Sequence, residues 1–138
     1  MVDAQFSIPY TVAATLVSGG LSLEEFTDAK LRSEDILDLA ARVKTILTPE
    51  FDRGPMDVKP QVVEIVMRDG KIFSEKVVYP KGNPNNPVSS EELVAAFRGM
   101  ASYAAKPLNG AKIDDALALT QRLEKVDDVA LLAKLLTA

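Results

Sequence analysis

The chain has 138 residues, of which 47% are hydrophobic and 26% are charged, a composition typical of one globular domain with a substantial core. The net charge is −4, and the scattered Lys and Arg residues form no basic patch, which argues against nucleic-acid binding. Cys is absent, which excludes a disulfide, a thiol nucleophile and a Cys-ligated metal. Neither a signal peptide nor a transmembrane run is recognisable, so we expect a cytoplasmic protein with no membrane partner.

Histidine is absent as well. It is the commonest general acid or base and the commonest ligand of transition metals. An enzyme can use Asp, Glu, Lys or Tyr instead, but the absence of His lowers the expectation that this chain performs chemistry alone.

Residues 4–17 predict a helix around which the rest of the chain is organised. Ser7 is placed to cap its first free N–H groups, and Pro9 falls in the first turn, where a missing N–H costs nothing. Gly19 and Gly20 supply the left-handed stop. Residues 8–17 carry no charge, so we expect this helix to be buried on several faces.

Tyr10 lies in the first turn of that helix. A buried tyrosine needs a partner for its hydroxyl. The sequence leaves two alternatives open: an acceptor within the core, or a group in a cleft. The choice between them is the functional question that this sequence raises.

The next elements are shorter. Ser22 and Glu25 have capping-box spacing, which predicts a short helix that ends near residues 27–28. Ser33 is expected to cap a helix whose apolar period continues to residue 46 and which ends at Pro49, although residues 44–48 could instead form a short strand. Residues 49–60 are rich in turn formers and are predicted to be a loop.

Residues 62–67 and 72–79 are predicted strands, joined by the hairpin signal of Asp69 and Gly70. A two-residue turn would place Glu64 opposite Glu75, which is unfavourable. We therefore expect a three-residue loop, which places Glu64 near Ser74 and Lys76. The first strand has apolar residues on both faces, so it is expected to be the inner strand and partly covered on each side.

Residues 79–87 contain three prolines and three asparagines, which excludes regular structure. The segment is either a surface connector or a loop that borders a ligand site. Ser89 and Glu92 then form a second capping box, which starts a helix that runs to about residue 105 and ends at Pro107.

Two more helices are predicted at the end of the chain. The first covers residues 110–126, and the second, capped by Asp127, covers residues 129–136. The residues expected to face inward from the first are Ile113, Leu117, Leu119, Thr120 and Leu123. The whole pattern indicates an α+β fold with a small antiparallel sheet, based on a hairpin and packed with helices, followed by C-terminal helices.

Few residues suggest chemistry. The adjacent acidic pairs lie at helix starts, where acids suit the dipole, and neighbours on a helix do not converge on one metal, so we predict no metal site. Ser7 has no base near it in sequence and is interpreted as a cap. The cations that could hold a carboxylate, although each is most simply a solvated surface residue, are Arg42, Lys76, Lys81 and Arg98.

The order of these signals nevertheless resembles a known family. The run AQFSIPY at residues 4–10, followed by an Ala-rich helix, is similar to the start of the C-terminal half of the MmgE/PrpD family. The similarity continues through LSLEEFTD (21–28), DLAARV (38–43), RDG (68–70), GNPNNPVSSEEL (82–93) and FR (97–98). It covers nearly the whole chain in order.

The resemblance implies a cofactor-independent lyase or isomerase that acts on small di- or tricarboxylates, such as 2-methylcitrate dehydratase or cis-aconitate decarboxylase. Family members have an all-helical domain and a smaller α+β lid, with the active site in the cleft between them. This chain is similar to the lid (residues 1–106) and to the last helices (107–138), which in the family pack on the helical domain. The family's catalytic His, Lys and Asp come mostly from upstream, so we expect the isolated chain to be inactive.

The resemblance also suggests roles for three residues. Tyr10 matches a lid tyrosine that looks into the cleft, where it could bind a substrate carboxylate or help to transfer a proton. Ser7 belongs to the same motif and is expected to bind substrate. Arg98, a further expected substrate-binding residue, matches a Lys/Arg-Phe-Arg/Lys pattern in which Ala96 replaces the first cation.

The sequence leaves two alternative functions. The chain could be a non-catalytic interaction module, because without a helical domain the apolar faces of residues 113–123 and 129–136 would be exposed, and we then expect a homo-oligomer. It could also be a small independent enzyme, but no constellation of residues supports that reading.

Overall fold

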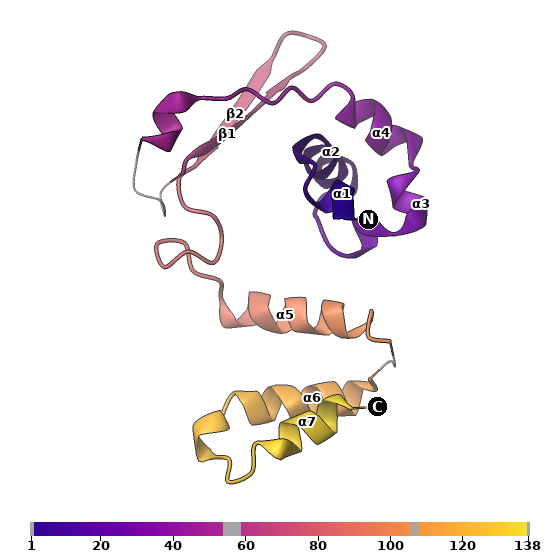
Figure 1. Ribbon diagram of the computed structural model, residues 1–138, viewed down its shortest axis with the longest axis vertical. Coiled ribbons are helices and arrows are strands. Elements are labelled where there is room, and N and C mark those ends of the chain that lie inside the picture. Colours follow the sequence, from indigo (N-terminus) through magenta and orange to yellow (C-terminus); the bar gives the residue numbers. More distant parts are fainter. Residues whose placement is uncertain (1, 54–58, 106–107, 138) are drawn as a thin grey trace. The chain divides into compact units, whose positions relative to one another are not determined.

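The computed structural model describes residues 2–53, 59–105 and 108–137 (Figure 1). The chain divides into two compact units, Met1–Asn86 and Pro87–Ala138. Within the described ranges it has seven α-helices and one two-stranded antiparallel sheet, which confirms the α+β class. None of these helices is long and apolar enough to cross a membrane. The sequence analysis placed a boundary after residue 106, between the lid-like part and the helices expected to pack on another domain. That boundary stays a prediction.

The first unit contains four short α-helices, two 3-10 helices and the hairpin. Their bounds are α1 (Val2–Gln5), α2 (Ile8–Ser18), η1 (Glu24–Phe26), α3 (Asp28–Leu31), α4 (Glu34–Ala40), η2 (Pro49–Asp52), β1 (Gln61–Val66) and β2 (Ile72–Val77). The second unit contains α5 (Ser90–Ala101), α6 (Gly110–Thr120), η3 (Leu123–Lys125) and α7 (Ala130–Leu136).

The predicted signals at the two ends of α2 are confirmed. The Ser7 hydroxyl oxygen accepts a hydrogen bond from the Tyr10 backbone N–H at 3.3 Å, and Pro9 lies in the first turn. Gly19 ends the helix with φ 75°, and its N–H donates to the Thr15 carbonyl at 2.9 Å. A left-handed residue at this position releases the chain from the helix without straining a side chain.

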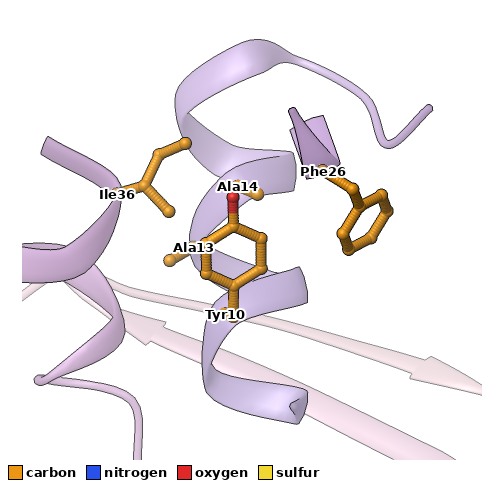
Figure 2. Packing of buried hydrophobic residues seen from close by; sticks show 5 residues of the cluster. All are labelled: Tyr10, Ala13, Ala14, Phe26 and Ile36. Atoms are coloured by element: carbon orange, nitrogen blue, oxygen red, sulfur yellow. The ribbon is translucent and has the colours of Figure 1, made fainter. Parts of the chain in front are cut away.

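The core of the first unit forms where α2 packs against α4. Ala13 and Ala14 are fully buried, as is Ile36 on α4. Phe26 of η1 belongs to the same core (Figure 2). Two alanines in one turn allow α4 to approach the α2 backbone closely, so that the larger Ile36 side chain fills the space between them.

The prediction that α2 is buried on several faces is wrong for the described chain. Ile8, Leu16 and Val17 are all more than 40% exposed. The absence of charge reflects a helix with one buried, Ala-rich face and an apolar outer face that no described element of the first unit covers.

The helix after Ser33 is shorter than its apolar period predicts. It ends at Ala40, and the N–H groups of Arg42 and Val43 donate to carbonyls three residues back, at 3.0 and 3.1 Å. This tightening ends the helix and satisfies its last carbonyls. Residues 44–48 are neither helix nor strand, so both alternatives for them are wrong. In the predicted loop 49–60, residues 49–52 form η2, and residues 54–58 lie outside the described residues.

The predicted hairpin register is confirmed. Glu64 pairs with Ser74, and the Met67 N–H donates to the Lys71 carbonyl at 2.8 Å, which leaves residues 68–70 as the loop. Gly70 has φ 86°. The expectation that β1 is covered on both sides is wrong, because five of its six residues are exposed. Only two strands pair in the described ranges. The apolar residues on the two faces of β1 therefore have no second described layer in the first unit to pack against.

In the second unit, the predicted capping box of α5 is confirmed. The Ser89 Oγ accepts from the Glu92 N–H at 3.1 Å, and the Glu92 carboxylate accepts from the Ser89 N–H at 2.7 Å. The helix ends at Ala101, a few residues before the predicted end, and Pro107 lies outside the described residues.

The two last helices, α6 and α7, pack against each other (Figure 1). Asn109 caps α6 by accepting from the Lys112 N–H at 2.8 Å. The helix buries Ala116 and Leu119, but it ends at Thr120, so the expected inward position of Leu123 is wrong, and Thr120 itself is exposed.

The predicted Asp127 cap of α7 is wrong, because the N-cap is Val129 and no side chain caps this helix. The carboxylate of Asp128, not that of Asp127, accepts from the Ala130 N–H at 2.9 Å. Short acidic side chains reach the N–H two residues ahead, and because α7 begins at Ala130, Asp128 has the correct spacing for this bond.

The left-handed conformation of Gly19 gives a test of the α2 stop. We predict that Gly19→Ala lowers the free energy of unfolding by about 1 kcal/mol, because a Cβ is unfavourable at positive φ. Urea unfolding followed by far-UV circular dichroism measures the change. Gly20→Ala is the matched control, since a Cβ at either glycine meets open space and only Gly19 has positive φ. Equal effects at both positions would contradict the assignment.

Candidate functional site

Ser7 and Tyr10 lie together in the first turn of α2. The Ser7 hydroxyl caps the helix through the Tyr10 N–H, and its carbonyl accepts from the Thr11 hydroxyl at 3.0 Å. The oxygen that substrate binding would use therefore already has a backbone partner, as the capping interpretation predicts.

Tyr10 is 6% exposed, and its ring lies against Phe26 with the centroids 6.0 Å apart and the planes tilted by 40°. Its hydroxyl donates to the backbone carbonyl of Glu25 at 2.5 Å. Figure 2 shows the ring between α2 and the Phe26 segment. Of the two alternatives left open by the sequence, this geometry is that of a core tyrosine bonded to a carbonyl.

The environment of Tyr10 makes its phenol a weak acid. Burial raises the pKa of Tyr10 above its ordinary value, and the negative charge of Glu25 raises it further. A neutral phenol has a single hydrogen to donate, and here Glu25 accepts it. A role of Tyr10 toward a substrate stays a prediction.

Glu25 is the residue that the sequence did not single out for the site. Its side chain is 6% exposed, and its Oε2 accepts from the Ser22 N–H at 2.7 Å and from the Ser22 hydroxyl at 2.9 Å. Burial acts to raise the pKa of Glu25, but the hydrogen bonds from Ser22, the Glu25 backbone and the Ser18 side chain together outweigh it, so the pKa lies below its ordinary value. The capping-box spacing of Ser22 and Glu25 was the available signal, but it does not show where the Glu25 carbonyl points.

Arg98 belongs to the second unit. Its guanidinium forms an ion pair with Asp114 at 2.5 Å, which joins α5 to α6. Both side chains are about half exposed, and an exposed pair of this kind contributes little to stability. The structure thus joins Ser7 to Tyr10 within one helical turn, while the partner of Arg98 is a residue of its own unit.

The loop at residues 79–87 is closed by its own hydrogen bonds. The Asn86 amide donates to the Tyr79 carbonyl at 2.9 Å, and Asn83 Oδ1 accepts from the Asn85 N–H at 2.9 Å. The Gly82 N–H donates to the Asn86 carbonyl, also at 2.9 Å. These internal bonds occupy groups that a ligand would use, so they favour the connector over a loop that borders a ligand site.

An open groove of about 350 Å³ lies between α6 and α7. Its lining residues are Asp115, Ala118, Leu119, Arg122, Leu131, Lys134 and Leu135. Apolar side chains form most of its surface, and no convergent set of buried polar groups marks it as a catalytic site. Throughout the described ranges, no three acidic residues come together as a metal site would require.

The hydrogen bond between Tyr10 and Glu25 gives a second test. We predict that Tyr10→Phe lowers the free energy of unfolding by about 1–3 kcal/mol, because the buried Glu25 carbonyl loses its partner. Denaturant unfolding measures this. Tyr79→Phe, at a half-buried position outside the core cluster, should change stability by less than about 0.5 kcal/mol. A neutral Tyr10→Phe would refute the assignment of this bond to the core.

The carboxylate of Glu25 gives a prediction of pH dependence. Because its pKa is lower in the folded chain, the folded state binds fewer protons than the unfolded state. The stabilisation is therefore present above the ordinary pKa of 4.5 and is lost as the pH falls through the lower folded value. We predict that stability falls less below pH 4.5 in Glu25→Gln than in the wild type, as measured by urea unfolding at a series of pH values. The exposed Glu34→Gln is the matched control and should keep the wild-type slope.

Comparison with known proteins identifies the family of this chain. The model of the MmgE/PrpD C-terminal domain matches residues 1–129. Among curated relatives, the cis-aconitate decarboxylases of Homo sapiens and Mus musculus are 23% and 27% identical over 134 and 135 residues, which is 97% of this chain in each case. That of Aspergillus terreus is 27% identical over 137 residues, or 98% of the chain.

The chain spans 27% of the length of each of these relatives, so the similarity concerns one part of a longer enzyme. The family match covers the Tyr10 motif, the hairpin and the capping box of α5 in a single stretch. The chain therefore belongs to the MmgE/PrpD family and corresponds to its C-terminal domain.

Proposed function

We propose that this chain acts as the lid portion of an MmgE/PrpD-type lyase or isomerase whose substrate is a small di- or tricarboxylate. The observation that carries the proposal is the family match over residues 1–129. A lid of this kind closes over the substrate and excludes water, and it needs no cofactor of its own. As in the sequence-based expectation, the intact enzyme would then act in the cytoplasm.

The choice of reaction remains between two members of the family. The resemblance of the sequence motifs suggested a dehydratase similar to 2-methylcitrate dehydratase, whereas the curated relatives are named cis-aconitate decarboxylase. Both act on compact tricarboxylates. We therefore propose the substrate class first, and 2-methylcitrate dehydration as the finer proposal within it.

Within this function, Tyr10 is the proposed catalytic residue and Ser7, Tyr10 and Arg98 are the proposed substrate-binding residues. The support for Tyr10 is its place in the family motif at residues 4–10, within the matched stretch. To bind a carboxylate, its hydroxyl would have to leave the Glu25 carbonyl. Ser7 would contribute through its effect on the first turn of α2. Arg98 would have to exchange Asp114 for a substrate carboxylate.

The isolated chain should have no activity, because the described part gathers no complete set of acid, base and substrate cations. We predict no turnover when the purified chain is incubated with 2-methylcitrate, citrate or cis-aconitate. We expect turnover of at least one of them when residues 1–138 replace the matched portion of the mouse cis-aconitate decarboxylase. Product formation is followed by liquid chromatography and mass spectrometry.

The control is the same mouse enzyme truncated before the matched portion, without the replacement. Turnover by the isolated chain would contradict the lid proposal. A folded chimera that turns over none of the three acids would contradict the substrate class. Loss of water identifies the dehydratase, and loss of CO₂ identifies the decarboxylase.

A second candidate is a non-catalytic domain that forms a homo-oligomer. Exposed apolar side chains in the last helices favour it, namely Leu123, Val129, Leu131 and Leu136. Apolar surface of this kind tends to be covered by a partner. We predict a dimer or larger species by light scattering at micromolar concentration, and a monomer would count against this candidate.

A further inference from the structure

Glu25 has two separate roles in the first unit. Its carboxylate closes the turn that begins at Ser22, through bonds of 2.7 and 2.9 Å to the Ser22 N–H and hydroxyl. The Ser22 hydroxyl oxygen also accepts from the Glu24 N–H at 3.1 Å. A buried carboxylate is tolerated only when such donors satisfy it, so these bonds hold the turn in one conformation.

The backbone carbonyl of the same residue points the other way, toward α2. It accepts the Tyr10 hydroxyl at 2.5 Å, across 15 positions of the sequence. The location of a carbonyl follows from the conformation of its own turn. The bonds between Ser22 and the Glu25 carboxylate therefore determine where the Tyr10 hydroxyl finds its acceptor.

This arrangement limits what Tyr10 can do. A phenol has one hydrogen to donate and keeps lone pairs that can accept. While Glu25 holds the hydrogen, Tyr10 can accept a hydrogen bond but cannot donate one to a carboxylate. The position of the Glu25 carbonyl thus determines whether the Tyr10 hydroxyl can donate a hydrogen bond to another group.

We propose that Glu25 is a positioning residue for Tyr10: its carboxylate braces the turn from Ser22, and its carbonyl thereby fixes the Tyr10 hydroxyl in position and as an acceptor. The catalytic meaning of this role rests on the proposed function, whereas the positioning itself concerns the isolated chain. If the bonds of the Glu25 carboxylate did not position its carbonyl, their loss would leave the Tyr10 hydroxyl unaffected.

The test follows the hydroxyl proton of Tyr10 in the full chain by NMR, with ¹³C-labelled tyrosine. Tyr10→Phe identifies its signal among the three tyrosines. Glu25→Ala should speed exchange of this proton with water by about tenfold or more, as expected when a buried hydrogen bond is lost. Glu25→Gln should restore slow exchange, to within about threefold of the wild type, because its amide oxygen can still accept from Ser22.

Two further variants keep the test decisive. Ser22→Ala removes one bond to the carboxylate, retains the other and should give intermediate exchange, so it replaces Glu25→Ala if that variant does not fold. The exposed Glu34→Gln changes the same charge elsewhere in this unit and should leave exchange unchanged. Slow exchange in folded Glu25→Ala or Ser22→Ala, or fast exchange in Glu25→Gln, would overturn the proposal.

The chimera used to test the proposed function also tests whether Glu25 affects catalysis through Tyr10. Glu25→Ala and Tyr10→Phe should each lower kcat, and the double variant should lose no more than Tyr10→Phe alone, since both act through one hydroxyl. Additive losses would overturn the catalytic part of the proposal. If the chimera turns over none of the acids, the proposed function fails, while the exchange measurements still decide the positioning.

Discussion

The hydrogen bond from the Tyr10 hydroxyl to the Glu25 carbonyl is the contact on which the first unit depends. It joins the first turn of α2 to η1 and places Phe26 against the Tyr10 ring. Phe26 and Ile36 then complete a core around the two alanines of α2. Because the core is small, this one buried hydrogen bond helps to position most of its side chains. The hydrogen bonds between Ser22 and the Glu25 carboxylate contribute to the same arrangement, because they hold the turn that carries the carbonyl.

The same smallness explains the exposed apolar side chains. A helix such as α2 can bury one stripe against α4, but the opposite side needs a second layer. Within the first unit, no described element supplies that layer for Ile8, Leu16 and Val17, nor for β1. These surfaces and membership of a family with longer enzymes are consistent with a domain that works beside another one.

The sequence predicted several features that depend on nearby residues, although the expected Ser33 cap forms no side-chain hydrogen bond. Ser7 and Ser89 cap their helices as expected, and the like-charge argument about Glu64 gave the correct hairpin register. Such contacts follow from spacing alone. The end of α4 was missed because an apolar period continued beyond Ala40 into an extended segment, where Ile46 and Leu47 are about 80% exposed.

The sequence left the partner open where that partner lies far away in the chain. The spacing of Ser22 and Glu25 indicated a capping box, but the partner of Tyr10 depends on how the turn folds back on α2, which no short pattern encodes. Similarly, Asp114 belongs to one of the adjacent acidic pairs that the sequence assigned to helix dipoles, whereas packing of α5 with α6 gives it Arg98 as a partner. Long-range contacts of this kind need the packed structure.

Most of the polar side chains discussed above already have structural partners, which limits the catalytic roles that this chain can have. The side chains that cap helices or brace turns, and so already have backbone partners, are Ser7, Glu25, Ser89, Asn109 and Asp128. Arg98 has Asp114. Tyr10 differs from them because its hydroxyl is held at one point while its oxygen can still accept a hydrogen bond. A neutral phenol whose hydrogen is held by the Glu25 carbonyl neither gives up nor takes up a proton in this state, so under the proposed lid function the proton transfers would come from residues outside this chain.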